Sequence, residues 1–198
     1  MINKLEICGL TKRFGEKTLF EDLDLTLAEP AVLWAPSGWG KTTLLRILMG
    51  LEVPDSGTVQ GVGRVGAVFQ EDRLCPQLTA EENVALVLTA EQYKVKTQYK
   101  EQIRDDLIRL GLDDEALALP ARKLSGGQKR RVAVAGVMAM KPRILVLDEP
   151  AAGLDPEGRD EILSEVKDYH KKTGTTVLLV SHSMEDIAKY ADKVLVMS

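Results

Sequence analysis

The sequence predicts an α/β protein with a mainly parallel sheet, and two observations support this fold class. Five short apolar segments end in polar or glycine-rich turns, as strands that are buried on both faces do. Helix-length segments alternate with these strands at both ends of the chain. The expected strands are residues 31–34, 65–69, 144–147, 176–180 and 194–197. The expected helices are residues 42–49, 80–88, 98–110, 126–140, 158–170 and 184–190.

Two other parts of the chain depart from this alternation. Near the N-terminus, residues 5–10 and 19–27 alternate apolar and polar side chains around a turn at Phe14-Gly15-Glu16, which predicts a small antiparallel sheet beside the main one. From about residue 73 to residue 140, helical patterns follow one another with no strand between them. The prediction is therefore a single domain over residues 1–198. Its α/β core spans residues 1–72 and 141–198, and a helical subdomain spans residues 73–140.

The composition excludes some classes of protein and disfavours others. A chain of 198 residues with 44% hydrophobic residues can bury a core without disulfides or structural metals. Cys8 and Cys75 are far apart in the sequence and form no C-x-x-C motif, so we expect two free thiols without a catalytic role. No apolar run approaches the roughly 20 residues of a membrane-spanning helix. A net charge of −4 and the absence of a dense basic stripe disfavour nucleic acid as a partner.

A phosphate-binding loop is predicted directly after the strand at residues 31–34. The loop and the start of the next helix read Ala35-Pro36-Ser37-Gly38-Trp39-Gly40-Lys41-Thr42-Thr43. Backbone amides of a glycine-rich turn at a helix N-terminus favour an anion, Lys41 would reach the β- and γ-phosphates, and Thr42 would ligate Mg²⁺. The usual first glycine of the motif is Ala35 here, which we expect to weaken nucleotide binding at worst.

Two carboxylates follow the strand at residues 144–147. Asp148 and Glu149 are therefore placed at the C-terminal edge of a buried strand, where ligands of open α/β sheets bind. Asp148 is predicted to hold Mg²⁺, directly or through water, and Glu149 to polarise an attacking water molecule.

The segment Leu124-Ser125-Gly126-Gly127-Gln128 opens the expected helix at residues 126–140. Ser125 suits the N-cap position, but a cap does not account for two glycines, which are unfavourable inside a helix by about 1 kcal/mol each. A glycine pair at a helix start is explained if exposed amides must approach an anion.

Taken together, these three motifs resemble the ABC ATPase family, and the resemblance covers essentially the whole chain. The resemblance implies that Gln70 contributes to the Mg²⁺ and water site, that Asp155 belongs to the nucleotide site, and that ATP and Mg²⁺ are the ligands. It also implies that His182 hydrogen-bonds the γ-phosphate and that Phe14 stacks on adenine. The second histidine, His170, lies near the end of a charged helix and is interpreted as solvated.

The resemblance further implies a head-to-tail dimer with a second copy or a homologous subunit. Each ATP would lie between the phosphate loop of one chain and Ser125 to Gln128 of the other, which adds amide donors and excludes water. The expected function is an ATP-hydrolysing subunit of an importer, located at the cytoplasmic face of the membrane. A separate permease would dock near Gln70 to Val84.

The two halves of the sequence resemble different subfamilies. Residues 68–84 are similar to ATPases of nitrate, sulfonate and taurine importers, whereas residues 126–140, 151–156 and 182–186 are similar to energy-coupling factor ATPases. A divergent natural importer and a recombined, chimeric sequence both account for this difference. Ala35 and Trp39 also leave open a binding-only or engineered cassette. A soluble ABC protein of translation or DNA repair is a further alternative, although tandem cassettes or a long coiled-coil insertion would be expected for it.

Overall fold

The computed structural model describes residues 5–27, 31–34, 40–61, 63–69, 73–88, 96–181, 183–190 and 193–196. By its internal contacts the chain forms two compact units. Unit 1 comprises residues 1–65, 142–147 and 170–198, and unit 2 comprises residues 66–141 and 148–169.

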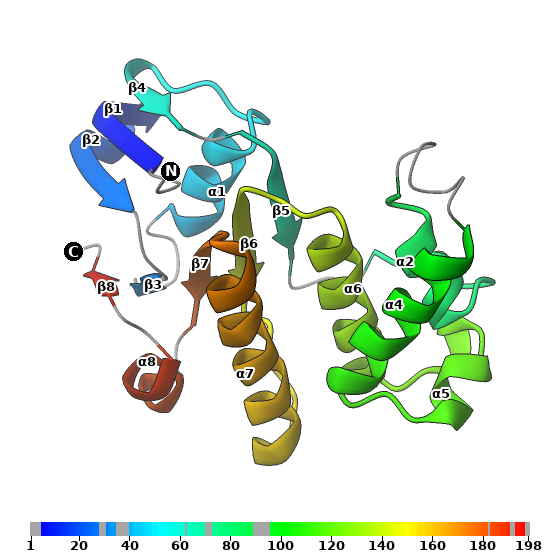
Figure 1. Ribbon diagram of the computed structural model, residues 1–198. Coiled ribbons are helices and arrows are strands. Elements are labelled where there is room, and N and C mark those ends of the chain that lie inside the picture. Colours follow the sequence, from blue (N-terminus) through cyan, green and yellow to red (C-terminus); the bar gives the residue numbers. More distant parts are fainter. Residues whose placement is uncertain are drawn as a thin grey trace. The chain divides into compact units, whose positions relative to one another are not determined.

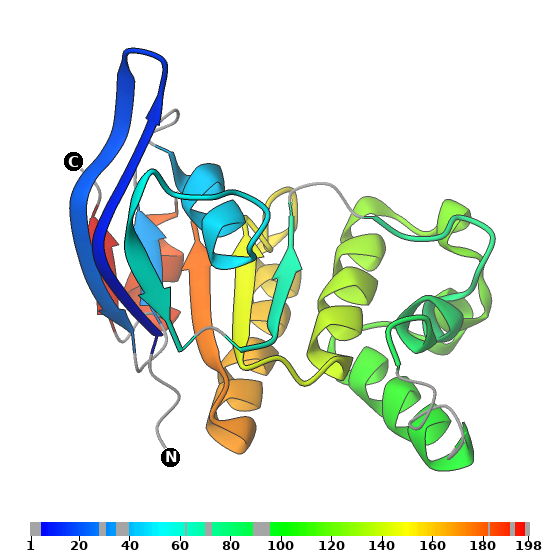
Figure 2. The ribbon, with the colours of Figure 1, turned by 90° about the horizontal axis from the view of Figure 1, so that it is seen from above.

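Unit 1 contains the antiparallel sheet predicted near the N-terminus. Strands β1 (Leu5–Phe14) and β2 (Lys17–Leu27) form a long hairpin, and β4 (Ser56–Gln60) pairs with the other edge of β1 (Figure 2). The side chains of Leu5, Ile7 and Leu10 are buried. The β4 strand was not predicted, because its side chains are mostly exposed and polar and it is held by backbone pairing with β1.

Unit 1 also contains four strands of the α/β core, apart from Asp148 at the end of one of them, which groups with unit 2. In sheet order these strands are β6 (Ile144–Asp148), β7 (Thr176–Val180), β3 (Ala31–Trp34) and β8 (Lys193–Val196). Strand β3 runs parallel to both β7 and β8. Every residue of β7 and the first four of β6 are buried, as the continuous apolar runs predicted. Lys193 Nζ of β8 lies 2.9 Å from the carbonyl oxygen of Thr26 in β2, so the two sheets are neighbours.

Two helices belong entirely to unit 1. Helix α1 (Lys41–Leu48) buries the apolar side chains of Leu44, Leu45, Ile47 and Leu48, and α8 (Met184–Tyr190) precedes β8. Strand β5 (Val65–Val68) begins in unit 1 and continues into unit 2, whereas α7 (Pro156–Thr173) begins in unit 2 and ends in unit 1. The predicted α/β class is confirmed.

Unit 2 is mainly helical between residues 73 and 141. Helices α2 (Ala80–Ala85), α4 (Lys96–Arg109) and α6 (Gly126–Ala139) pack against one another (Figure 1). Helix α5 (Asp114–Ala118) and the short 3₁₀ helix η1 (Ala121–Lys123) were not predicted. Both are too short for a helical periodicity to be visible in the sequence. The side chain of Asp113 caps α5 by accepting a hydrogen bond from the amide of Ala116.

The interpretation of His170 as solvated is only partly correct. His170 is half-buried in α7, and its Nδ1 atom lies 2.7 Å from the carbonyl oxygen of Thr175. The chain turns back after α7 at Gly174, whose φ of 69° places the following residue near the histidine ring. Helical spacing alone could not show this contact, since the partner lies beyond the end of the helix.

Candidate functional site

The phosphate-binding end of α1 is described from Gly40 onward. Gly40 precedes the helix with a φ of 83°, and its carbonyl oxygen accepts the first helical hydrogen bond, from Leu44. A Cβ at Gly40 would also come within 2.8 Å of the Phe20 ring. Glycine is therefore required at this position both for its backbone conformation and for close packing. Lys41 and Thr42 follow in the first turn of α1, and Ala35 to Trp39, including Ser37 and Gly38, lie outside the described residues.

The two acidic residues lie where the sequence placed them, at the C-terminal end of β6. Asp148 and Glu149 are half-buried, whereas the strand residues before them are buried. Glu149 has a φ of 52°, in the left-handed region. That conformation costs a residue with a Cβ roughly 1–2 kcal/mol, and such residues cluster at active sites. The turn after it closes through a hydrogen bond from the amide of Ala152 to the carbonyl oxygen of Glu149, at 3.1 Å.

Asp155 ends the loop that follows Glu149. Its Oδ1 atom accepts a hydrogen bond of 2.9 Å from the amide of Gly158, and its carbonyl oxygen accepts one from the amide of Arg159. Asp155 is thus the N-cap of α7, with Pro156 in the first helical position that this residue favours.

The Ser125 to Gln128 segment forms a capping box at the start of α6. The Ser125 hydroxyl accepts a hydrogen bond from the amide of Gln128, and the Gln128 side chain accepts one from the amide of Ser125. The predicted N-cap role of Ser125 is confirmed. In the part of the chain that the structure describes, no acceptor is found for the amides of Gly126 and Gly127 at this helix start.

The two glycines of this segment differ in their surroundings. A Cβ on Gly127 would come 2.7 Å from Cδ2 of Leu154, so the segment packs tightly on the loop that carries Asp155. A Cβ on Gly126 would meet nothing within 4 Å. Packing inside unit 2 therefore explains Gly127, whereas nothing around Gly126 in the described residues requires a glycine.

Two arginines of α6 have contacts that the sequence analysis missed. Arg130 is buried and donates a hydrogen bond from Nη1 to the carbonyl oxygen of Phe69, the residue before Gln70. Arg131 donates to the carbonyl oxygen of Gly111 and forms an ion pair of 2.7 Å with Glu161 of α7. The spacing of Arg130 from the buried Val134 and Met138 was the available signal, because residues four and eight apart share one face of a helix.

Two predicted catalytic residues, Gln70 and His182, lie outside the described residues. The structure places Ser125 to Gln128 and Asp155 together in unit 2, which also contains Asp148 and Glu149. Lys41, Thr42, Thr43 and Phe14 belong to unit 1. Phe14, at the end of β1, is half exposed, and its stacking on adenine stays a prediction.

Unit 2 contains a cavity of about 200 Å³ near Phe69. Arg73 lies over the Phe69 ring, with its guanidinium carbon 5.6 Å from the ring centroid. Leu86 and Val87 line the same cavity and expose 64% and 38% of their surface. The buried Asn83 stabilises one wall of this cavity, because its side chain accepts a hydrogen bond from the amide of Cys75 and donates to three carbonyl oxygens.

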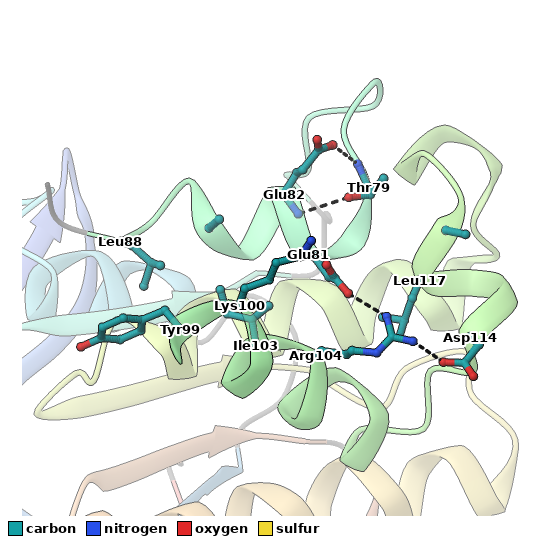
Figure 3. Close-up of a pocket in the computed structure, with 12 residues that line it drawn as sticks. Thr79, Glu81, Glu82, Leu88, Tyr99, Lys100, Ile103, Arg104, Asp114 and Leu117 are labelled. Carbon is teal, nitrogen blue, oxygen red and sulfur yellow. Dashed lines mark hydrogen bonds and ion pairs between the residues drawn. The ribbon is translucent and has the colours of Figure 1, made fainter. Parts of the chain in front are cut away.

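A larger cavity, of about 640 Å³, lies between α2, α4 and α5. Three of its charged side chains are engaged with one another: Arg104 pairs with Glu81 and Asp114 (Figure 3). Glu82 is occupied by the cap of α2. None of the residues predicted to bind nucleotide lines this cavity, so it does not belong to the candidate nucleotide site.

Comparison with known proteins agrees with the motifs and the fold. Residues 21–152 match the model of the ABC transporter family. The chain is 40% identical, over 98% of its length and 75% of the relative's, to an energy-coupling factor transporter ATP-binding protein, EcfA2, of Clostridium tetani. It is 37% identical, over 98% of its length but only 56% of the relative's, to a sulfate/thiosulfate import ATP-binding protein, CysA 2, of Chromobacterium violaceum.

Two solved structures are similar over 98% of this chain. The dimeric ATP-binding cassette MJ0796, in a post-hydrolysis state with ADP and Pi, has a TM-score of 0.82, 26% identity and 94% of its own chain covered. CbiO1 of Clostridium perfringens, part of the transporter complex cbiONQ, has a TM-score of 0.82, 27% identity and 84% of its chain covered. The chain belongs to the ABC transporter family, as one of its ATP-binding ATPase subunits. No helix in the described ranges is long and apolar enough to span a membrane.

Proposed function

We propose that the chain drives a membrane importer by hydrolysing ATP in a head-to-tail dimer. Each ATP would lie between the start of α1 in one copy and the start of α6 in the other. Relatives support import, since one is named for sulfate/thiosulfate import and others for energy-coupling factor transport. A similar cassette, MJ0796, was solved as a dimer with ADP and Pi.

The observation that carries the proposal is the start of α6. The capping box satisfies Ser125 and Gln128, while the amides of Gly126 and Gly127 point along a helix end that favours anions. Gly126 has open space where a side chain would stand, so a phosphoryl group held by another copy can approach the backbone closely. Among the described residues of one chain this glycine has no packing function, and between two chains it would have one.

The residues of one copy divide the chemistry among them. Lys41 would neutralise the β- and γ-phosphates, and amides from Ser37 to Thr43, including Gly38, Trp39 and Gly40, would bind the remaining phosphate oxygens. Glu149 would orient the attacking water, with Gln70 and His182 beside the γ-phosphate. Phosphoryl transfer to water needs positioning and charge neutralisation more than covalent chemistry, and this set supplies both.

Mg²⁺ would enter with ATP. Mg²⁺ prefers oxygen ligands, which the Thr42 hydroxyl, the Asp148 carboxylate and the Gln70 side chain would supply. Asp148 is only half-buried, which leaves part of its surface accessible. The ion would supply charge neutralisation at the phosphate oxygens. Phe14 would hold the adenine, and Asp155 would lie next to the Ser125 to Gln128 segment of its own chain, since its loop packs on Gly127.

The test of this function uses Glu149→Gln. The variant keeps the side-chain volume but removes the carboxylate that orients water, so we expect it to bind ATP and to accumulate as a dimer. Gel filtration with Mg-ATP should show the dimer, while ADP leaves a monomer. A variant that stays monomeric with saturating ATP contradicts the sandwich. Wild-type protein that dimerises with ATP but releases no phosphate would instead be a binding-only cassette.

The membrane permease would dock on the cavity beside Phe69, within the Gln70 to Val84 region and the start of the following turn. Its apolar rim of Leu86 and Val87 is exposed next to the cation of Arg73, which suits a cytoplasmic helix with an apolar side chain and an acidic neighbour. Arg130 ties Phe69 to α6, so a docked helix would contact the segment that leads to Gln70. The chain would then be peripheral at the cytoplasmic face of the membrane.

Docking is tested with membranes of the source cell that have been stripped of peripheral proteins. Leu86→Asp should reduce rebinding of the purified chain at least tenfold, because a carboxylate would stand in the apolar rim. Ile108→Asp is the matched control, since Ile108 is an exposed apolar residue of the same unit outside this cavity. Equal rebinding of both variants excludes this docking surface.

A further inference from the structure

Lys12 lies beneath the aromatic ring that the proposed nucleotide site uses. Lys12 and Phe14 are two residues apart in β1 and so share one face of the strand. Lys12 is 7% exposed, and its Nζ atom lies 4.9 Å from the centroid of the Phe14 ring. Phe14 remains 50% exposed, which leaves ring surface for a ligand. The distance is within the range of a cation–π interaction.

The ammonium group is held in place by the segment that follows α1. Lys12 Nζ lies 2.8 Å from the Glu52 carboxylate, 2.8 Å from the carbonyl oxygen of Val53 and 3.8 Å from the Asp55 carboxylate. Burial of an ammonium group costs free energy, and oxygen partners of this kind offset that cost. Three oxygen atoms of this segment therefore fix the position of the cation.

The same segment is fastened to the backbone on both sides of Lys12. The amide of Asp55 donates to the carbonyl oxygen of Thr11 at 2.9 Å, and the Asp55 carboxylate accepts from the amide of Arg13 at 2.6 Å. The segment leaves α1 through Gly50, and α1 carries Lys41 at its other end. The end of β1 is thus tied to the helix that would bind the phosphates.

We propose that Lys12 is a positioning residue for the nucleotide base, an inference that rests on the proposed role of Phe14. The ammonium group fixes one face of the ring, so the opposite face meets the base. A cation on one face draws π-electron density toward itself and makes the other face less negative. That face stacks better on an electron-rich purine. Lys12 therefore contributes to the affinity for the base and not to the affinity for the phosphates.

The experiment compares Mg-ADP with inorganic pyrophosphate, because neither ligand requires a dimer. Lys12→Met keeps the length of the side chain and removes its charge. We expect the dissociation constant of Mg-ADP to rise about fivefold, while that of pyrophosphate stays within twofold of the wild-type value. Calorimetric titration measures the first constant, and competition with a fluorescent nucleotide measures the second. An unchanged ADP constant, or equal losses for both ligands, overturns the inference.

A double-mutant comparison separates positioning from a general structural role. In a Phe14→Ala background, Lys12→Met should have no further effect on ADP binding, since Lys12 acts through the ring. A further loss of similar size in that background shows a structural role and overturns the inference. If Phe14→Ala itself leaves ADP binding unchanged, the proposed adenine site on Phe14 fails as well. If Phe14→Ala weakens ADP binding but Lys12→Met does not, the inference about Lys12 is wrong and the adenine site on Phe14 stands.

A second variant covers the case in which Lys12→Met does not fold. Glu52→Gln removes the closest negative partner of the ammonium group, but it leaves Lys12 in place on a partly exposed segment. We expect the affinity of this variant for ADP to be about twofold weaker and its affinity for pyrophosphate to be unchanged. Retention of full ADP affinity by a well-folded Glu52→Gln, with Lys12→Met unfolded, counts against the role of a fixed ammonium group.

Discussion

Leu154 lies so close to Gly127 that a Cβ on this glycine would come 2.7 Å from its Cδ2 atom. The contact joins the loop before Asp155 to the start of α6, within unit 2. The neighbouring Gly126 has no such contact. Packing therefore accounts for glycine at position 127 but not at position 126, and substitutions at the two positions can be tested separately.

Gly126→Ala should leave the fold intact and impair function. Alanine is favoured over glycine in a helix by roughly 0.5–1 kcal/mol, so the free energy of unfolding should not fall. The added methyl group would nevertheless obstruct the approach of the partner's phosphoryl group, and the ATPase rate should drop at least tenfold. Denaturant unfolding and phosphate release measure the two effects.

Gly127→Ala serves as the contrasting variant. Its methyl group must displace the Cδ2 atom of Leu154, the flexible end of a side chain, so we expect its free energy of unfolding to lie about 1 kcal/mol below that of Gly126→Ala. If Gly126→Ala destabilises the chain as much as Gly127→Ala does, the distinction between the two glycines is wrong.

The left-handed backbone of Glu149 predicts a gain in stability on substitution by glycine. Glu149→Gly should be more stable than Glu149→Ala by about 1 kcal/mol, because only glycine adopts a φ of 52° without strain. Both variants lack the carboxylate, so both should lose nearly all ATPase activity. Equal stabilities in urea unfolding would mean that the backbone at Glu149 is not strained.

Asp155 caps helix α7, and it is also predicted to belong to the nucleotide site. Asp155→Ala should lower the free energy of unfolding by about 1 kcal/mol, since it removes the acceptor of the Gly158 amide. Asp155→Asn keeps a capping oxygen and should restore that stability. An ATPase rate that Asp155→Asn leaves unchanged would assign Asp155 to the cap alone.

Trp39 stands between two glycines where the family that the sequence resembles usually has a small residue. We hypothesise that this indole, which would lie near the dimer interface in the proposed arrangement, weakens or reshapes ATP-driven dimerisation. Trp39→Ser should raise the dimer fraction at a given ATP concentration, as measured by analytical ultracentrifugation. No change in the ATPase rate or in the dimer population removes the hypothesis.

The sequence predicted best the parts of the fold that depend on long apolar runs. The buried strands β6 and β7 and the capping box at Ser125 follow from local patterns. Strand β4 does not follow from a local pattern, because it forms through backbone pairing with β1. Helical spacing could have placed Arg130 on the buried face of α6, but no local pattern displays its partner Phe69. The same holds for Glu52, the partner of the buried Lys12, which is distant from it in the sequence. The roles of Gln70 and His182 stay predictions.

The division into residues 1–72 with 141–198 and residues 73–140 also stays a prediction. By contacts, residues 148–169 group with the helical part, because Arg131 of α6 pairs with Glu161 of α7 and Leu154 packs on Gly127. Sequence patterns mark where helices and strands alternate, but side-chain contacts decide which elements form a compact unit.

The central claim is that each ATP site is built from two copies, and a mixing experiment tests it most directly. Lys41→Ala disables the phosphate-binding end of α1, and Gly126→Arg places a large cation at the start of α6, where a Cβ meets nothing within 4 Å in the described residues. Each variant alone should be inactive. A mixed dimer contains one site with an intact α1 from one copy and an intact α6 from the other. Mixing should therefore restore ATP-dependent dimers, detected by energy transfer between labels on the two variants, together with phosphate release. No recovery of either signal on mixing would contradict the account.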